Sequence, residues 1–228
     1  MRLTDMDRLR LFVAVLALAT GIAFTPVSAA GQRIVGQPPE KPLKDTSMIK
    51  PPPGAKVAIY EFEDLECPMC AHTHPIVMAA VEHYKIPFVR RDYPLPLHIW
   101  STDAAIWARY LQDKVSPKTA DDYRTAVFAS QTAIASKDDM MNFTRKFFQS
   151  HGLQMPFVVD PAGDLRKEVF ADKALGEKLG LSQTPTLFVC TDHNWVLVTE
   201  PDKLYQTIDQ VESQVSSAPG GAVKKASR

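Results

Sequence analysis

The sequence lacks an excess of charge of either sign. Its 228 residues include 26 Lys and Arg and 26 Asp and Glu, so the formal net charge is zero. A nucleic acid or other polyanion is bound mainly through clustered basic residues, and the composition gives no sign of such a partner. No internal repeat is visible either. With 45% hydrophobic residues, a chain of this length can hold one substantial domain and a terminal extension.

Cysteine is also scarce, with three residues in the whole chain. Cys67 and Cys70 form one Cys-x-x-Cys pair, and the sequence contains no second pair. Because a structural zinc site needs four ligands, this argues against half of a zinc site. The pair follows the strand-forming run 57–62 and precedes a helix-compatible segment, 71 to about 84. A Cys-x-x-Cys pair between a strand and a helix is typical of a redox motif.

The position of Cys67 favours a reactive sulfur. At the N-terminus of a helix, free amide N–H groups and the helix dipole stabilise a thiolate. Thiols in such motifs titrate at about 3.5–7.5 instead of about 8.5, so we predict that Cys67 is a nucleophile near neutral pH. Cys70 follows about one helical turn later, close enough to form a small disulfide with it.

The stretch 61–70, Glu-Phe-Glu-Asp-Leu-Glu-Cys-Pro-Met-Cys, resembles the motif of the DsbA-like branch of the thioredoxin superfamily, the exported thiol–disulfide oxidoreductases. Pro75 falls where these proteins kink their first helix. Far downstream, Thr184-Pro185-Thr186 and the strand-forming run after it are similar to the family's cis-proline turn. The resemblance spans about 55–217 and implies an α/β, thioredoxin-like fold. It further implies a central mixed sheet flanked by helices, with an all-helical insertion at about 97–152.

The resemblance also implies roles for individual residues. Cys67 is the sulfur at which exchange occurs, and Cys70 is the more buried resolving thiol. Glu61 matches a buried carboxylate under the second cysteine, and we expect burial to raise its pKa. The turn at Pro185, with a cis peptide bond, should lie against the cysteine pair. Substrate is then expected to contact Pro68, Met69, Thr184 and Pro185. No cofactor is expected.

Two histidines allow a different interpretation of the motif. His72 and His74, with Cys67, Cys70 and Met69, form a set of soft and borderline ligands that could hold copper or zinc. In a helix, residues two positions apart point in directions about 200° apart, so the two histidines cannot face one metal. We therefore predict no metal site, while a copper-binding chaperone module remains an alternative function.

The third cysteine, Cys190, lies about 16 Å beyond Pro185 along an extended strand, too far to join the redox pair without a bend. We expect a buried, inert thiol. An intermolecular bridge or a second reactive thiol is the alternative.

The ends of the chain differ from its middle in composition. Residues 1–29 combine a basic start, an apolar run and an A-x-A-like end, which predicts a signal peptide, with an N-terminal anchor as the alternative. Residues 30–54 hold six prolines and almost no large apolar side chains, which predicts a Pro-rich linker too short to be a dimerisation domain. Residues 218–228 are predicted to be a disordered tail.

Hydrophobic periodicity and cap signals divide the domain into elements. The predicted strands are 57–62, 86–93, 186–190 and 194–198, and the second is expected to run parallel to the first. Helices are predicted after the motif, within the insertion, from about 162 to 179, and from 201 onward. The predicted N-terminal caps within the insertion are Ser101, Thr119 and Ser136.

The direction of exchange is harder to predict than its chemistry. Strong oxidases of the family often carry histidine where this sequence has Met69, which cannot donate a hydrogen bond to the thiolate. Oxidation of exported proteins is favoured, with a periplasmic reductase or isomerase as the alternative. The expected partners are exported proteins with thiols or disulfides and a membrane redox partner that recycles the pair. We expect a monomer in the periplasm or another extracytoplasmic location.

Overall fold

The computed structural model describes residues 32–35 and 42–217. The predicted signal peptide and the predicted disordered tail lie outside these residues. The strands are β1 (Gln32–Val35), β2 (Ala58–Glu63), β3 (Phe88–Asp92), β4 (Thr186–Cys190) and β5 (Trp195–Val198). The α-helices are α2 (Pro68–Tyr84), α3 (Ser101–Lys114), α4 (Pro117–Ser130), α5 (Lys137–Ser150), α6 (Asp164–Leu179) and α7 (Leu204–Ser217). Short 3₁₀ turns are η1 (Thr46–Met48), η2 (Gln131–Ala133) and η3 (Pro201–Lys203).

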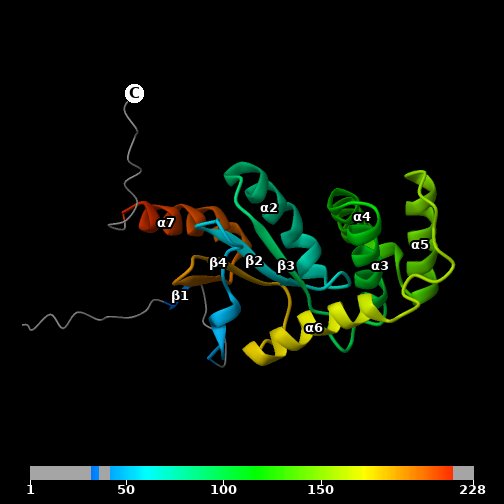
Figure 1. The fold of residues 1–228 in the computed structure, drawn as a ribbon, viewed down its shortest axis with the longest axis horizontal. Helices are drawn as coiled ribbons and strands as arrows, with labels where there is room; N and C mark the ends of the chain where they lie inside the picture. Colours follow the sequence, from blue (N-terminus) through cyan, green and yellow to red (C-terminus); the bar gives the residue numbers. More distant parts are fainter. Residues whose placement is uncertain (1–31, 36–41, 218–228) are drawn as a thin grey trace, which may run out of the picture. The chain divides into compact units, whose positions relative to one another are not determined.

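The strands form one mixed sheet in the order β1-β5-β4-β2-β3 (Figure 1). β2 pairs with β3 in parallel, as predicted, and with β4 in antiparallel orientation. Because β2 lies between two partners, all six of its residues are buried. α2 and α7 cover one face of the sheet, and α6 lies on the other (Figure 1). The predicted thioredoxin-like fold is therefore confirmed.

Successive residues of β2 point to opposite faces of the sheet. Ile59 packs with the apolar residues of α2 and α7, whereas Tyr60 and Phe62 pack with those of α6. Glu61 and Glu63 share the face of Ile59 by this alternation. Two carboxylates are thus buried in the middle of the fold, at 2% exposure each, where charge has to be compensated.

The predicted all-helical insertion consists of α3, α4 and α5. Ser136 caps α5 as predicted, because its hydroxyl accepts from the N–H of Asp139. The other two predicted caps are wrong. The cap of α4 is Ser116, three residues before Thr119, and Pro117 occupies the first helical position. Ser101 is already inside α3, and the N–H groups of Trp100 and Ser101 are bound by the side chain of Glu66 instead.

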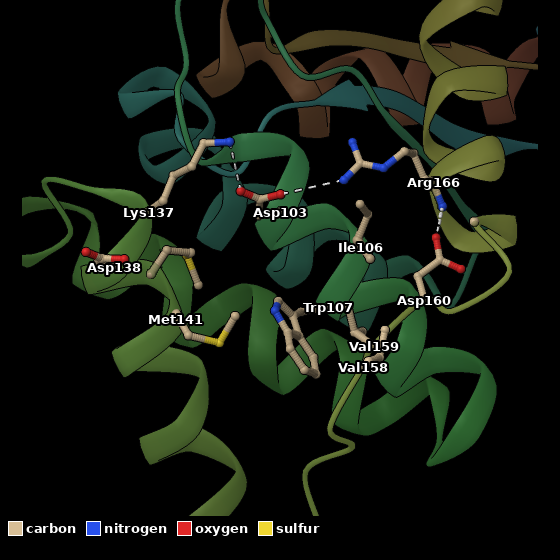
Figure 2. A pocket seen from close by; sticks show the side chains of 12 residues that line it. Asp103, Ile106, Trp107, Lys137, Asp138, Met141, Val158, Val159, Asp160 and Arg166 are labelled. Carbon is tan, nitrogen blue, oxygen red and sulfur yellow. Dashed lines mark hydrogen bonds and ion pairs between the residues drawn. The ribbon is translucent and has the colours of Figure 1, made fainter.

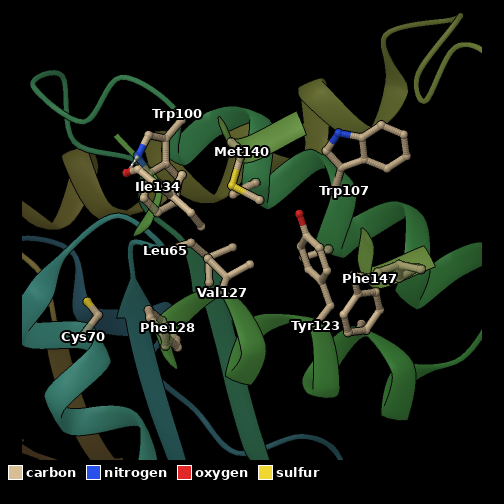
Figure 3. Packing of buried hydrophobic residues seen from close by; sticks show 14 of the residues in the cluster. Leu65, Cys70, Trp100, Trp107, Tyr123, Val127, Phe128, Ile134, Met140 and Phe147 are labelled. Atoms are coloured by element: carbon tan, nitrogen blue, oxygen red, sulfur yellow. Dashed lines mark hydrogen bonds between the residues drawn. The ribbon is translucent and has the colours of Figure 1, made fainter. Parts of the chain in front are cut away.

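Two of the contacts between the insertion and the rest of the molecule lie near the cysteine motif. The first, which we term the apolar joint, packs the loop before α2 and both of its cysteines against side chains of α3, α4 and α5. Its fully buried members include Leu65, Cys70, Trp100, Val127, Phe128, Ile134 and Met140. Figure 3 shows these residues, with Leu65 and Val127 pointing toward one another.

The second, the charged joint, is a set of linked ion pairs among eight side chains of β2, β3, α3, α4 and α6. Its acids are Glu63, Asp92, Asp121 and Asp172, and its bases are Arg90, Arg91, Arg109 and Arg124. Arg124 is the most deeply placed base, with 1% of its side chain exposed. Buried charges are tolerated when they are paired, and each charge of this set has at least one partner of opposite sign.

The structure differs from the predicted linker at 30–54. Gln32–Val35 forms β1 and pairs in parallel with β5. Farther on, Ile49 is 2% exposed and joins the apolar cluster of α6, while Leu43 and Met48 pack against it. The N–H of Lys44 donates to the carbonyl of Leu179 at 2.9 Å. Three apolar side chains among many prolines are enough to attach this segment to the domain, so the boundary at residue 55 was placed too late.

Within the part of the chain that the structure describes, no helix is both long and apolar enough to cross a membrane.

Candidate active site

The cysteine pair lies at the start of α2, directly after the central strand. Cys67 is the N-cap residue, with extended backbone angles, and Pro68 takes the first helical position. Pro75 stands inside the helix, as the resemblance implied. The sulfur of Cys67 lies 3.3 Å from the carbonyl oxygen of Thr184, to which it donates when it is protonated. Two motifs more than a hundred residues apart in sequence therefore meet at this sulfur.

The peptide bond between Thr184 and Pro185 is cis, as predicted. The turn leads directly into β4, whose antiparallel pairing places Thr186 opposite Phe62 of β2. Since β2 also leads into the cysteine motif, the sheet register brings the turn to the sulfurs.

The two sulfurs differ in their protonation. The pKa of Cys67 is lowered to about 5 by the hydrogen bond from the Cys70 thiol, then by Thr184 and the N–H groups of Cys70 and Met69, against the opposing effect of burial. Burial raises the pKa of Cys70 well above its usual value, and the hydrogen bond to Cys67 and the charge of Glu61 act in the same direction. Such an arrangement keeps a thiolate on Cys67 and a proton on Cys70 at neutral pH.

Glu61 is buried, and burial followed by the charge of Glu63 raises its pKa well above the ordinary range. The prediction of a buried carboxyl group with a raised pKa is confirmed. Its Oε2 atom is buried without a hydrogen-bond partner among the described residues. A carboxyl group that retains its proton at this depth costs far less than a carboxylate would.

Sequence reasoning missed two acids that hold the motif loop. Asp64 is 1% exposed and accepts hydrogen bonds from the backbone of Glu66 and Leu95, the His98 ring and the Ser101 hydroxyl. Its own N–H lies 3.4 Å from the sulfur of Cys70. Glu66 caps α3 through Oε2. The acidic residues Asp64 and Glu66, just before the cysteine pair, were the signal that could have revealed these contacts.

The residues predicted to contact substrate have different exposures. Pro68 and Met69 lie at the surface, and 53% of Met69 is exposed. Thr184 is buried at 8%, and Pro185 is partly buried. Around the motif loop, the segment that follows β3 adds the exposed apolar side chains of Leu97 and Ile99.

The remaining residues singled out in the sequence lie apart from the sulfurs or serve packing. His72 is exposed, whereas His74 is buried and pairs with the hydroxyl of Thr125 at 2.8 Å. Among the described residues, no three His, Cys, Asp or Glu side chains gather in a way that could hold a metal ion. Cys190 is fully buried, and burial raises its pKa to about 12, as expected for an inert thiol.

A hollow of about 400 Å³ lies between the insertion and the segment that leads into α6, and it involves none of the predicted site residues. Its apolar walls include Ile106, Trp107 and Val159 (Figure 2). At its rim Asp103 pairs with Lys137 at 3.1 Å and with Arg166 at 4.0 Å. Because the rim charges already neutralise one another in part, the hollow offers little to orient a charged ligand.

Comparison with known proteins gives one family and a group of structures. The model of a family described as thioredoxin matches residues 43–210. A search of curated proteins gives no match. The solved structure of *Wolbachia pipientis* alpha-DsbA1 with two cysteine substitutions is 17% identical, covers 75% of this chain and 97% of its own, and has a TM-score of 0.61.

Two further structures are similar at comparable levels. *Pseudomonas aeruginosa* DsbA2 is 18% identical, with 78% of this chain and 97% of its own covered and a TM-score of 0.54. *Proteus mirabilis* ScsC is 17% identical, with 72% and 71% covered and a TM-score of 0.54. At these identities the structures establish the fold, and the family match extends over most of the chain. The chain therefore belongs to the thioredoxin family and has a DsbA-like fold.

Proposed function

We propose that this protein is an exported thiol–disulfide oxidoreductase that exchanges disulfides with extracytoplasmic proteins through Cys67 and Cys70. The observation that carries the proposal is the asymmetry of the pair: the pKa of Cys67 is lowered to about 5, and that of Cys70 is raised. Only the thiolate is nucleophilic, and a thiol of low pKa is also a good leaving group. Structural cysteines have no need of such a difference.

The proposed exchange passes through a mixed disulfide on Cys67. A substrate thiolate attacks the sulfur of Cys67 in the Cys67–Cys70 disulfide, and Cys70 leaves with the electron pair of the broken bond. Glu61, protonated because its pKa is raised, supplies a proton to Cys70. A second substrate thiolate then attacks the substrate sulfur of the mixed disulfide and releases Cys67 as its stabilised thiolate. In the reverse direction Glu61 accepts the proton of Cys70.

Substrate is proposed to lie over Pro68 and Met69 and beside the turn at Thr184 and Pro185. The exposed side chain of Met69 gives an apolar surface next to the sulfur without a specific hydrogen bond. Pairing with the backbone near Thr184 would recognise an extended segment with little regard to its side chains. Such recognition suits an enzyme with many protein substrates.

The favoured direction is oxidation of substrates. Relative to its ordinary value of 9.0, the depressed pKa of Cys67 stabilises the folded, reduced protein. That stabilisation is fully present above the ordinary value and is lost as the pH falls through about 5, so at neutral pH it favours the reduced form and makes the disulfide a better oxidant. The proposal includes a membrane redox partner, a monomeric enzyme and an extracytoplasmic location reached through residues 1–29.

A trapping experiment tests the assignment. Cys70→Ala should accumulate mixed disulfides with exported proteins, because the resolving thiol is gone, whereas Cys67→Ala should trap none. Cys190→Ala, with its buried thiol, is the matched control and should behave as the wild type. Equal trapping by the Cys67 and Cys70 variants would contradict the roles. Equilibration with glutathione buffers then gives the potential, and a value as reducing as that of thioredoxin, about −270 mV, would contradict the oxidising direction.

A further inference from the structure

One side chain of the helical insertion, that of Arg124, is buried against the strand that leads into the redox motif. Arg124 of α4 has 1% of its side chain exposed, and its Nη1 atom donates to Glu63 at 2.8 Å and to Asp92 at 2.7 Å. Arg90 approaches the same Glu63 oxygen with Nε at 3.0 Å, an ion pair without hydrogen-bond alignment. Glu63 is thus held between two guanidinium groups from different elements.

Glu61 is the neighbour of this arrangement. It lies two residues before Glu63 on β2, so the two side chains leave the strand on the same face. Around Glu61 the charged and titratable groups are Glu63 on its own strand, Arg90 on β3, Arg124 on α4, and the two thiols at the start of α2. The side chain of His74, also on α2, lies near the same arginines.

Charge counting within this region singles out Glu61. The charged joint contains four acids and four arginines, which balance without it. A fifth carboxylate would be uncompensated in a buried site, at a cost that protonation avoids. Its Oε2 atom indeed has no hydrogen-bond partner among the described residues. The balance of the joint therefore decides whether Glu61 is charged.

We propose that Arg124 is a positioning residue that, together with Glu63, controls the proton on Glu61. Glu63 disfavours a charge on Glu61, and Arg124 and Arg90 favour it. A change at Arg124 on the insertion therefore alters the protonation of Glu61. The inference deepens the proposed function and rests on it for its consequence. Resolution proceeds from the fraction of molecules in which Glu61 is ionised: the proton of Cys70 passes to Glu61, the Cys70 thiolate bonds to Cys67, and the other thiol leaves as a thiolate.

The test is a titration of Glu61 that needs no turnover. Reduced protein carrying ¹³C-labelled glutamate carboxyls is followed by NMR between pH 4 and 10, and the Glu61 signal is the one missing in Glu61→Gln. Removing the like charge in Glu63→Gln should lower the Glu61 midpoint, and removing the positive charge in Arg124→Met should raise it, each by about one pH unit or more. Arg124→Lys keeps a positive charge and should restore most of the wild-type value.

Opposite signs distinguish this role from a structural one. A merely structural perturbation admits water to Glu61 and lowers its midpoint in every variant. If Arg124→Met fails to fold, Arg90→Gln takes its place and should also raise the midpoint, because Arg90 is less buried and faces the same Glu63 oxygen. Unchanged midpoints, or shifts of the same sign in Glu63→Gln and the arginine variant, would overturn the inference.

A second readout separates this inference from the proposed function. Release of glutathione from a Cys67–glutathione mixed disulfide is measured against pH in the same variants. If Glu61 accepts the proton of Cys70, the pH step in release should follow the NMR midpoint of each variant. A release profile without that step would contradict the proposed role of Glu61 in exchange. The NMR shifts alone test whether Arg124 controls the protonation of Glu61.

Discussion

The apolar joint and the charged joint attach the helical insertion to the rest of the domain by different means. At the apolar joint, Leu65 and both cysteines pack against side chains of α3, α4 and α5, without an ion pair among the members named above (Figure 3). At the charged joint, arginines of α3 and α4 reach carboxylates of β2, β3 and α6. Both lie next to the candidate active site, since Cys70 belongs to the first and Glu63 lies two residues from Glu61.

The difference concerns what each joint can transmit. Apolar packing depends on volume and burial, and it acts on the sulfurs by excluding water, which raises the pKa of Cys70. Ion pairs depend on charge and on the direction of their contacts. The electric field of these charged side chains shifts the pKa of Glu61. A buried charge left alone costs more than a small cavity, so the charged joint should be the less tolerant of change.

Arg124→Met is the strongest test of the difference between the two joints. Glu63 and Asp92 would each lose a buried partner, and breaking a buried ion pair in this way costs about 3–5 kcal/mol in the free energy of unfolding. Urea denaturation of the reduced protein gives the value. Arg145→Met on α5, an exposed arginine, is the matched control and should change stability by less than about 0.5 kcal/mol. A loss below about 1 kcal/mol would mean that the joint tolerates an unpaired charge.

Truncation at the apolar joint should cost somewhat less. Leu65→Ala removes a side chain that is 2% exposed, and such a change costs about 2–5 kcal/mol by lost burial and a cavity. Leu97→Ala, nearby in the fold but 89% exposed, should be almost neutral and is its control. If Leu65→Ala proves more costly than Arg124→Met in the same urea series, the ranking of the two joints is wrong.

Much of this molecule could be predicted from the sequence because its signals are local. The strand-forming run 57–62 and the Cys-x-x-Cys after it indicated the site, and Ser136 with Asp139 indicated a true cap. The resemblance supplied the cis Pro185. What escaped prediction depends on side chains that meet across the fold. Glu66 caps a helix 34 residues away, and Arg124 of α4 reaches Glu63 of β2.

The prediction for the segment before residue 55 missed its packing for a related reason. Its composition, six prolines in 25 residues, indicated a spacer. Composition does not show whether an edge strand has an open side, and β5 offers one to β1. Nor does it show that Ile49 is buried in the apolar cluster of α6. In this segment, strand pairing and burial in the assembled fold outweigh the preference of a proline-rich composition for an extended linker.

The smallest of the expected effects lies at Glu66, the residue after Leu65 of the apolar joint. Oε2 of Glu66 accepts from the N–H of Trp100 at 2.6 Å and from that of Ser101 at 2.9 Å, so it serves as the cap that α3 lacks locally. Glu66→Ala removes the acceptor and should cost about 1 kcal/mol, in the range of lost N-caps. Glu66→Gln keeps an acceptor oxygen and loses only the favourable charge at the helix N-terminus, worth about 0.3–1 kcal/mol. Hydrogen exchange at the first amides of α3 should therefore accelerate more in Glu66→Ala than in Glu66→Gln, with α5, capped by Ser136, unchanged in both. Equal acceleration in the two variants would show that charge, not the hydrogen bond, stabilises this end of α3.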